Sequence, residues 1–231
     1  MFKILFLFKS KSSFEIFYNF FISKVKNIFN KKKIVSFKRK HQSFISTKRI
    51  TKDYFSSHAF NFLNYLKNLN SDFDYLEIGS YEGNSAIFVA KNLTKEKIYC
   101  VDNWEQTNEY ADHKNYYNVK KNFDLNIKDY KNVYKIKISS DDFFLKNEKK
   151  FDTVYIDGYH HGAEIFKDCK NAWKYLKNNG YLICDDYIWN FYKNIKDNPC
   201  YAINQFLNEI NAYFKVEKVS NSQIFIKKIN S

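Results

Sequence analysis

Short apolar runs alternate with amphipathic stretches along the chain from Tyr54 to its end. Five of the runs predict buried strands, at residues 73–79, 97–102, 133–138, 151–157 and 181–186. The stretches before and between them place apolar residues at helical spacings, at residues 55–66, 85–92, 116–127 and 162–176. Strands that alternate with helices in this way predict an α/β fold with a doubly wound, mostly parallel sheet.

The last part of the chain predicts a different strand connection. After a helix expected at residues 202–212, two strands at 214–219 and 223–228 are separated only by the short Ser-Asn-Ser segment 220–222. A connection this short joins antiparallel neighbours, because a parallel pair needs a long crossover. The sheet is therefore expected to finish in an antiparallel pair. Earlier in the chain, the helix expected at residues 162–176, before the fifth strand, is expected to stop at Asn178-Asn179-Gly180.

Charge divides the chain into two expected regions, a basic arm at residues 1–50 and an α/β domain at residues 51–231. The arm has 13 Lys and Arg against one acid, Glu15, whereas the other 181 residues have 25 basic and 24 acidic groups. A nucleic-acid-binding domain usually spreads basic surface over its fold, so the balanced domain argues against nucleic acid as the partner.

The arm itself contains an apolar pattern that predicts a helix with an aromatic stripe, at residues 14–29. Such a helix could pack on its own domain or on another subunit of a homo-oligomer. It could also lie on an anionic membrane surface, because lysines follow it, or bind nucleic acid. We expect residues 1–50 to be dispensable for cofactor binding and to help localise or dimerise the protein.

The predicted compartment is the cytoplasm, with the inner membrane face as a place for peripheral contact. The four cysteines form no C-x-x-C motif, and no apolar run reaches the roughly 18 residues of a membrane span. The short apolar start of the chain is interrupted by Lys9 and Lys11 and lacks a small-residue cleavage site, so we do not expect secretion.

The candidate chemistry lies where strands end, because open α/β sheets bind ligands beyond the carboxyl ends of their strands. The first strand runs into a turn with two glycines, Gly79 and Gly83, which lets a backbone approach a ligand closely or simply forms a tight turn. The second ends at Asp102, which could accept both hydroxyls of a ribose or cap a turn. Trp104 offers a flat face to a nucleobase or belongs to the core. Ser139–Asp142 could frame a base edge or cap a helix.

The fourth and fifth strands end in acids, Asp157 on one and Asp185 and Asp186 on the other. If these strands are neighbours, the three carboxylates converge and repel one another unless a cation neutralises them. Oxygen ligands suit Mg²⁺ or Mn²⁺ rather than zinc, and such a cation would acidify a bound hydroxyl. The alternative is that the acids are solvated strand ends or caps. His160 could act beside Asp157 or be structural.

Three sequence segments resemble the class I S-adenosylmethionine-dependent methyltransferases. They are EIGSYEGNSA at 77–86, VDNWE at 101–105, and YIDGYHHGAEIFKDCKNAWKYLKNNGYLICDDY at 155–187. The combination of I-D-G-x-H with D-D 28 residues later resembles the metal-dependent O-methyltransferases of macrolide-sugar and aminocoumarin biosynthesis. The resemblance extends over residues 53–228, and residues 1–50 lie outside it.

The resemblance implies a seven-stranded sheet with S-adenosylmethionine over its first three strands. It implies that Glu77, Gly79, Gly83 and Ser85 line the methionine and ribose, that Asp102 binds the ribose hydroxyls, and that Ser140 and Asp141 contact the adenine. It also implies a divalent metal, Mg²⁺ in our prediction, on Asp157, Asp185 and Asp186. Asp157 would serve as general base with His160 beside it. Tyr159 and Asn103 depart from residues frequent in relatives.

The leading functional hypothesis is an enzyme that methylates a hydroxyl of a sugar or similar small polyol with metal assistance. A second hypothesis is a methyltransferase for a catechol-like aromatic, since a metal can chelate two vicinal phenolic oxygens. A third, from a different class, is an RNA-binding protein or RNA methyltransferase that uses the basic arm.

Overall fold

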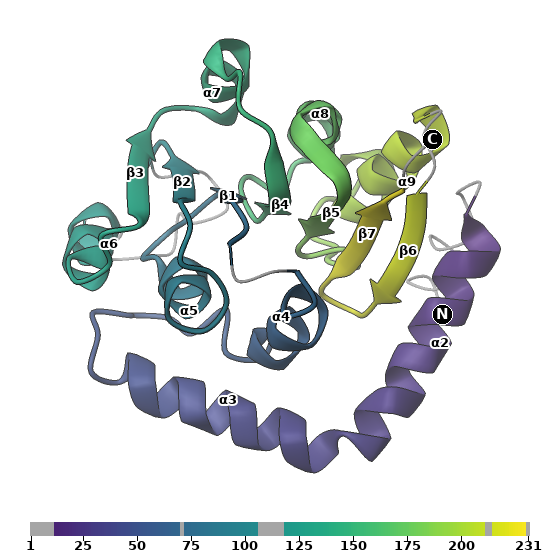
Figure 1. Ribbon diagram of the computed structural model, residues 1–231. Helices are drawn as coiled ribbons and strands as arrows, with labels where there is room; N and C mark the ends of the chain where they lie inside the picture. Colours follow the sequence, from purple (N-terminus) through teal and green to yellow (C-terminus); the bar gives the residue numbers. More distant parts are fainter. Residues whose placement is uncertain (1–11, 70–71, 106–117, 211–213, 230–231) are drawn as a thin grey trace. The chain divides into compact units, whose positions relative to one another are not determined.

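In the computed structural model, seven strands form one sheet in the order β3-β2-β1-β4-β5-β7-β6 (Figure 1). The strands are β1 (Tyr75–Ile78), β2 (Ile98–Asp102), β3 (Val133–Lys137), β4 (Phe151–Ile156), β5 (Leu176–Cys184), β6 (Phe214–Val219) and β7 (Ile224–Lys228). The pairs β1–β2, β2–β3 and β4–β5 are parallel, whereas β5–β7 and β6–β7 are antiparallel. This confirms the predicted fold class. The structure describes residues 12–69, 72–105, 118–210 and 214–229.

Helices precede and connect the strands. They are α2 (Ser13–Phe29), α3 (Lys31–Ile45), α4 (Ala59–Leu66), α5 (Asn84–Asn92), α6 (Val119–Ile127), α7 (Ser140–Lys146), α8 (Gly162–Tyr175) and α9 (Pro199–Glu209), with a short 3₁₀ helix η4 (Ile195–Asp197). The pattern did not predict α3 or α7. In α3 a run of lysines obscures apolar positions that have helical spacing, and α7 has only seven residues.

The chain divides into two compact units. One, residues 29–139, is called the N-terminal unit here. The other, residues 1–28 with 140–231, is called the C-terminal unit. In the N-terminal unit every residue of β1 is buried, and seven of the nine residues of α5 are buried as well. Burial on both faces is typical of parallel strands covered by helices, and it fixes the carboxyl ends of β1 and β2 in place.

In the C-terminal unit α8 packs against β4, β5 and α9. The junction between α8 and β5 differs from the prediction. The helix ends at Tyr175, and β5 begins at the next residue, so Asn178-Asn179-Gly180 lies within the strand instead of stopping a helix. Leu176 already pairs with Phe151 of β4, and the register then shifts before Thr153. Tertiary pairing with β4 has thus overridden the local turn signal.

The helix α2 covers the edge strand of the C-terminal unit. Glu15 Oε1 accepts a hydrogen bond from the backbone nitrogen of Val216 at 2.9 Å, and Asn19 Nδ2 donates to the Val216 carbonyl at 2.6 Å. These two side chains satisfy backbone groups that an edge strand otherwise exposes. The buried residues Ile16 and Phe20 lie on the same side of the helix. The contacts agree with the alternative in which this helix packs on its own domain.

No helix in the described part of the chain is both long and apolar enough to cross a membrane. The division of the chain at residue 50 stays a prediction. In the structure the described part of residues 1–28 groups with the C-terminal unit, and residues 29–50 group with the N-terminal unit.

Candidate active site

The turn between β1 and α5, residues 79–83, is called the glycine turn here. Its backbone is left-handed at three positions. The φ angles are +84° at Gly79, +46° at Tyr81 and +79° at Gly83. Glycine takes such angles without steric cost, whereas Tyr81 does so at a cost of roughly 1–2 kcal/mol. A Cβ on Gly83 would lie 3.0 Å from Phe123 Cδ2 of α6. The positive φ angle and the packing of α6 thus both favour glycine at position 83, and the close approach of a ligand to its backbone stays a prediction.

Asp102, at the end of β2, holds this turn in shape. Its Oδ2 accepts hydrogen bonds from the backbone nitrogens of Ser80 and Tyr81, each at 2.9 Å, and its Oδ1 accepts one from Trp104 at 2.6 Å. Burial raises the pKa of Asp102, and the three backbone donors and the nearby Lys135 oppose that shift. A carboxylate has about four acceptor positions, so one position remains for a ligand.

Glu77 is completely buried beneath the turn. The phenolic oxygen of Tyr75 donates to Glu77 Oε2 at 3.0 Å, whereas Oε1 has no hydrogen-bond partner among the described residues. Burial raises the pKa of Glu77 to about 7, against the effect of the Ser85 and Ser80 hydroxyls. A buried acceptor without a partner is costly, which makes Glu77 a candidate for binding a ligand.

Trp104 is largely buried, and its contacts resemble those of a core aromatic. The indole Nε1 donates to the Tyr81 carbonyl at 2.8 Å, the ring lies 4.8 Å from the Phe123 ring, and Lys135 Nζ lies 4.8 Å from the Trp104 ring centroid. These contacts tie the end of β2 to the glycine turn and to α6. The predicted stacking of Trp104 on a nucleobase stays a prediction.

One residue of the basic arm, His41, and two residues just after the arm, Thr51 and Asp53, support the glycine turn, and the sequence did not predict these contacts. His41 Nε2 lies 2.7 Å from Asn84 Oδ1, and Asn84 Nδ2 donates to Asp53 Oδ1 at 3.2 Å. Thr51 donates twice to the carboxylate of Glu82, from its backbone nitrogen at 2.6 Å and from its hydroxyl at 2.9 Å. The helical spacing of the apolar residues in α3 was the signal that could have placed His41 on the inner face of that helix.

Ser140 and Asp141, predicted to contact an adenine, begin α7 in the C-terminal unit. The Ser140 hydroxyl hydrogen-bonds to the buried Asp168 and lowers its pKa, although burial raises that pKa overall to about 7. Asp141 is exposed and forms an ion pair with Lys167 at 2.9 Å. Their described partners thus belong to α8, and their contact with a cofactor stays a prediction.

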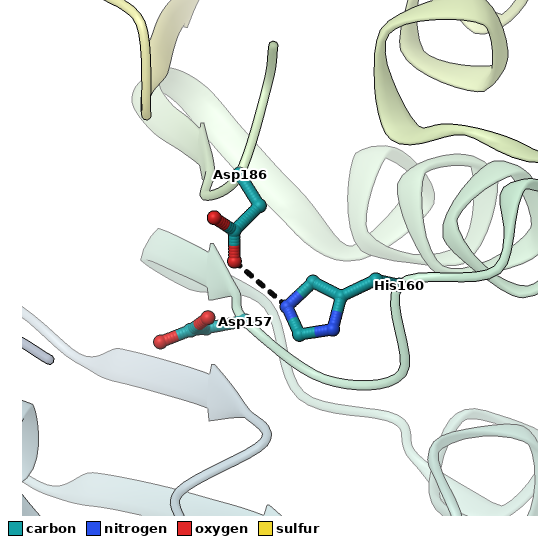
Figure 2. Close-up of side chains that lie close together, drawn as sticks. All are labelled: Asp157, His160 and Asp186. Atoms are coloured by element: carbon teal, nitrogen blue, oxygen red, sulfur yellow. Dashed lines mark ion pairs between the residues drawn. The ribbon is translucent and has the colours of Figure 1, made fainter. Parts of the chain in front are cut away.

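Acidic and imidazole groups converge at the carboxyl ends of the adjacent parallel strands β4 and β5 (Figure 2). Asp157, His160 and Asp186 each offer one ligand atom, and these atoms lie within 4.8 Å of one another. His160 Nε2 is 2.8 Å from Asp186 Oδ2. The backbone of Asp186 has a φ angle of +51°, a strained conformation of the kind that clusters at functional sites. We call these three residues the acidic cluster.

Asp185, the third predicted metal ligand, lies outside this group. Its Oδ2 accepts hydrogen bonds from Tyr155 and, at 3.0 Å, from Gln223 Nε2. The Tyr155 hydroxyl also lies 2.9 Å from Asp157 Oδ2. A phenol has only one proton, so it cannot donate to both carboxylates at once. Asp185 therefore contacts Asp157 through Tyr155, and its direct contact with a metal stays a prediction.

The electrostatics of the acidic cluster favour a cation. Burial raises the pKa of Asp157 well above its ordinary value, the carboxylates of Asp185 and Asp186 raise it further, and His160 and Tyr155 lower it. Two carboxylates and an imidazole form a donor set that suits Mn²⁺ or Mg²⁺, and the imidazole makes the set less purely oxygen-based than predicted. The chemistry of the residues thus fits a divalent cation.

The loop at residues 189–192, called the aromatic loop here, borders the acidic cluster. The sequence did not predict this neighbour. The Trp189 ring lies 4.8 Å from the His160 ring and stacks on Phe191 with the two planes 7° apart. The buried side chain of Asn198 holds this loop, because it accepts from the backbone nitrogens of Phe191 and Tyr192 and donates to two carbonyls. The only sequence signal was the proximity of Trp189 to the D-D pair.

Comparison with known proteins gives one family match. Residues 76–187 match the family described as "Methyltransferase domain", a segment that contains the glycine turn and the acidic cluster. No curated protein matches the sequence.

Solved methyltransferase structures have a similar fold. A protein of Streptococcus mutans described as a methyltransferase, in complex with SAH, is 16% identical with a TM-score of 0.55 over 78% of this chain and 100% of its own. A Klebsiella pneumoniae protein described as an O-methyltransferase is 16% identical, with a TM-score of 0.54 over 90% of this chain and 97% of its own. The mycinamycin-pathway methyltransferase MycE, in complex with Mg, SAH and mycinamycin VI, is 11% identical, with a TM-score of 0.53 over 78% of this chain and 51% of its own.

At these low sequence identities, the structural similarity shows a shared fold. The seven-stranded order with its antiparallel last pair is the sheet that the resemblance implied. Residues 76–187 thus match the methyltransferase family model, and the seven-stranded sheet has the fold of solved methyltransferase structures.

Proposed function

We propose that this protein transfers a methyl group from S-adenosylmethionine to a hydroxyl of a sugar or similar small polyol, with assistance from a divalent cation. The observation that carries the proposal is the convergence of Asp157, His160 and Asp186 at the ends of two paired strands within a methyltransferase domain. A cation in the structure of the MycE complex gives further support.

The residues of the glycine turn fit the proposed cofactor. S-adenosylmethionine supplies a methyl group bonded to a positively charged sulfur, which makes that group electrophilic. Glu77 has a buried oxygen without a partner, and Asp102 retains one acceptor position near the end of β2. We propose that these two acids, with the backbone of Gly79 and Gly83 and the hydroxyl of Ser85, bind the cofactor.

The acidic cluster fits the proposed cation. A cation there would supply Lewis acidity toward an acceptor hydroxyl and so lower its pKa. We propose that Asp157 takes the hydroxyl proton, with His160 beside it, because burial and the neighbouring carboxylates raise the pKa of Asp157 and so make it a stronger proton acceptor. We propose that Asp185 orients Asp157 through Tyr155, so that its effect on catalysis is indirect.

The aromatic loop gives the acceptor an apolar surface. Trp189 is next to His160, and Phe191, which stacks on it, is exposed. A sugar ring has apolar C–H groups on its face and hydroxyls around its edge, so it can pack on such a surface while a hydroxyl is directed toward the acidic cluster. Few polar groups on an apolar wall are typical of small-molecule sites.

The test combines a methyl-transfer assay with direct measurement of metal binding. Purified full-length protein is incubated with S-adenosylmethionine and a panel of free and nucleotide-linked sugars, catechol and an RNA oligonucleotide, with and without EDTA. Calorimetry with Mn²⁺ and Mg²⁺ compares the wild type with Asp186→Asn and with the control Glu148→Gln, which removes an exposed acid elsewhere in the same unit.

We expect chelator-sensitive methylation of a sugar, and metal binding that Asp186→Asn abolishes but Glu148→Gln retains. Methylation of catechol alone would contradict the acceptor class. Methylation of RNA alone would contradict the small-molecule reaction. Full activity in EDTA, together with equal metal binding by wild type and Asp186→Asn, would overturn the role of the cation.

A further inference from the structure

The helix α2 has a second face that its contact with β6 does not use. At 100° per residue, seven apolar side chains lie within about a third of the helix circumference. They are Phe14, Phe17, Tyr18, Phe21, Val25, Ile28 and Phe29. Most are exposed, and the two at the ends of the helix, Phe14 and Phe29, are 83% and 85% exposed. Glu15, Ile16, Asn19, Phe20 and Ser23, on the other side, face the protein.

The next helix, α3, has a basic outer face. Its inner face is fixed by Phe37, which lies 5.8 Å from Phe60, and by His41, which contacts Phe55 and Phe88. Its outward side chains include six basic residues that make no ion pair among the described residues. These six are Lys31, Lys32, Lys33, Lys38, Arg39 and Lys40. No acid occurs in the sequence between Glu15 and Asp53.

We propose that the exposed stripe of α2 binds the surface of an anionic lipid bilayer, and that the basic residues of α3, the next helix along the chain, add electrostatic attraction to the anionic headgroups. An amphipathic helix with aromatic residues on one face inserts that face at the headgroup level, and lysines add attraction to anionic lipids. Each helix is already folded on its own unit through its inner face, so binding needs no new folding. The inference is independent of the proposed reaction.

Two other binding partners, a single-stranded nucleic acid and a second copy of the chain, fit this surface less well. A single-stranded nucleic acid site interleaves aromatic and basic side chains along one groove, whereas here they are segregated on successive helices. A second copy of the chain would bring the exposed Lys24, which flanks the stripe, close to its own copy, where the two like charges repel. A bilayer with anionic headgroups matches both the apolar and the basic surface.

The experiment is vesicle flotation of the full-length protein. One set of vesicles is phosphatidylcholine with one quarter phosphatidylglycerol, and the other is phosphatidylcholine alone. The variants are Phe14→Ser/Phe21→Ser and Lys31→Gln/Lys32→Gln/Lys33→Gln. Their matched controls are Leu125→Ser/Leu145→Ser, which removes exposed apolar residues elsewhere, and Lys146→Gln/Lys150→Gln/Lys193→Gln, which removes exposed lysines elsewhere. Thermal melting verifies that each variant is folded, and light scattering without lipid gives the oligomeric state.

We expect binding at least about tenfold tighter to the anionic vesicles than to the neutral ones, weakened by salt because exposed charges are screened. Each test variant should lower binding by roughly tenfold or more, and the controls should bind like the wild type. Equal binding to both vesicles, or no effect of either test variant, would overturn the proposal. So would a dimer that Phe14→Ser/Phe21→Ser dissociates, or tighter binding to an RNA oligonucleotide through the same lysines.

Discussion

The glycine turn and the acidic cluster both gather charged side chains at the carboxyl ends of strands, but they compensate the charge differently. In the turn, Asp102 accepts three backbone hydrogen bonds, which offset part of the effect of burial on its carboxylate, although its pKa is still raised. In the acidic cluster, Asp157 faces two further carboxylates and shares one phenolic proton with Asp185. We infer that the turn is organised before any ligand binds, whereas the acidic cluster needs a cation to neutralise its charge.

The largest expected effects come from replacing an aspartate by asparagine, once in the acidic cluster and once at the glycine turn. Asp157→Asn should lower the affinity for Mn²⁺ by roughly 100-fold or more, because even the loss of an outer-shell partner costs up to that much. It should not destabilise the metal-free protein, because it removes one of several like charges. Asp102→Asn should instead destabilise the protein by about 2 kcal/mol, the usual cost of losing hydrogen bonds to a charged group.

Calorimetry with Mn²⁺ and urea unfolding measure the two effects separately. Asp102→Asn serves as the control for metal binding and should bind Mn²⁺ like the wild type. The comparison fails if Asp157→Asn and Asp102→Asn lose the same amount of stability, or if both retain the wild-type metal affinity.

The second prediction concerns Gly83, where two costs combine. Gly83→Val puts a β-branched residue at a φ angle of +79° and a Cβ at 3.0 Å from Phe123. We expect a loss of about 3 kcal/mol of stability from the backbone and the overpacking. The variant that still folds should bind S-adenosylmethionine at least about tenfold more weakly, because the turn is distorted.

Gly83→Ala is the matched variant, since it has the same Cβ without the branching, and its losses should be intermediate. Calorimetry at a temperature where each variant is folded gives the affinity. An unchanged affinity in a folded Gly83→Val protein would mean that the turn does not bind the cofactor.

The third prediction uses the pH dependence of Glu77. Its folded pKa of about 7 lies above the unfolded value of 4.5, so the folded state holds the proton more tightly. The corresponding stabilisation is complete below about pH 4.5 and is lost as the pH rises through about 7, by about 3 kcal/mol at most. Glu77→Gln should remove this part of the pH dependence.

Urea unfolding of the wild type and Glu77→Gln between about pH 5 and 8.5 measures the difference. Asp168, whose pKa is also about 7, titrates over the same range, so Asp168→Asn is the control that separates the two contributions. A Glu77→Gln protein with the same stability-versus-pH curve as the wild type would show that Glu77 does not titrate in this range.

The smallest expected effects come from two substitutions in the basic arm, one in α3 and one in α2. His41→Ala removes a partner of Asn84, next to the glycine turn, and should weaken S-adenosylmethionine binding by roughly threefold. Glu15→Ala uncovers the backbone nitrogen of Val216 and should lower stability by about 1 kcal/mol with the cofactor affinity unchanged. Equal cofactor affinities in the two variants would support the expectation that residues 1–50 are dispensable for cofactor binding.

Most of the fold could be predicted from the sequence, because apolar periodicity depends on local sequence. Each predicted strand overlaps an observed one, and Asp102, Asp157 and Asp186 lie at or just after the ends of strands as expected. The prediction failed at the start of β5, where pairing with β4 overrides a helix-stop signal, and at α3, where lysines obscure an amphipathic pattern. A contact between residues far apart in the sequence, such as that of His41 with Asn84, produces no periodic pattern from which it could be predicted.

The sequence by itself determined the alternation of strands and helices, the antiparallel last pair, and the accumulation of acids at two strand ends, since these depend on residue order. Only the tertiary structure decided which of the acids face one another. Asp185 and Asp186 are adjacent in the chain, but Asp185 is directed toward Tyr155 and Gln223, and Asp186 toward His160. The left-handed backbone at Asp186 accompanies this divergence. Backbone angles and side-chain directions at a strand end depend on packing with other elements, which residue order does not specify.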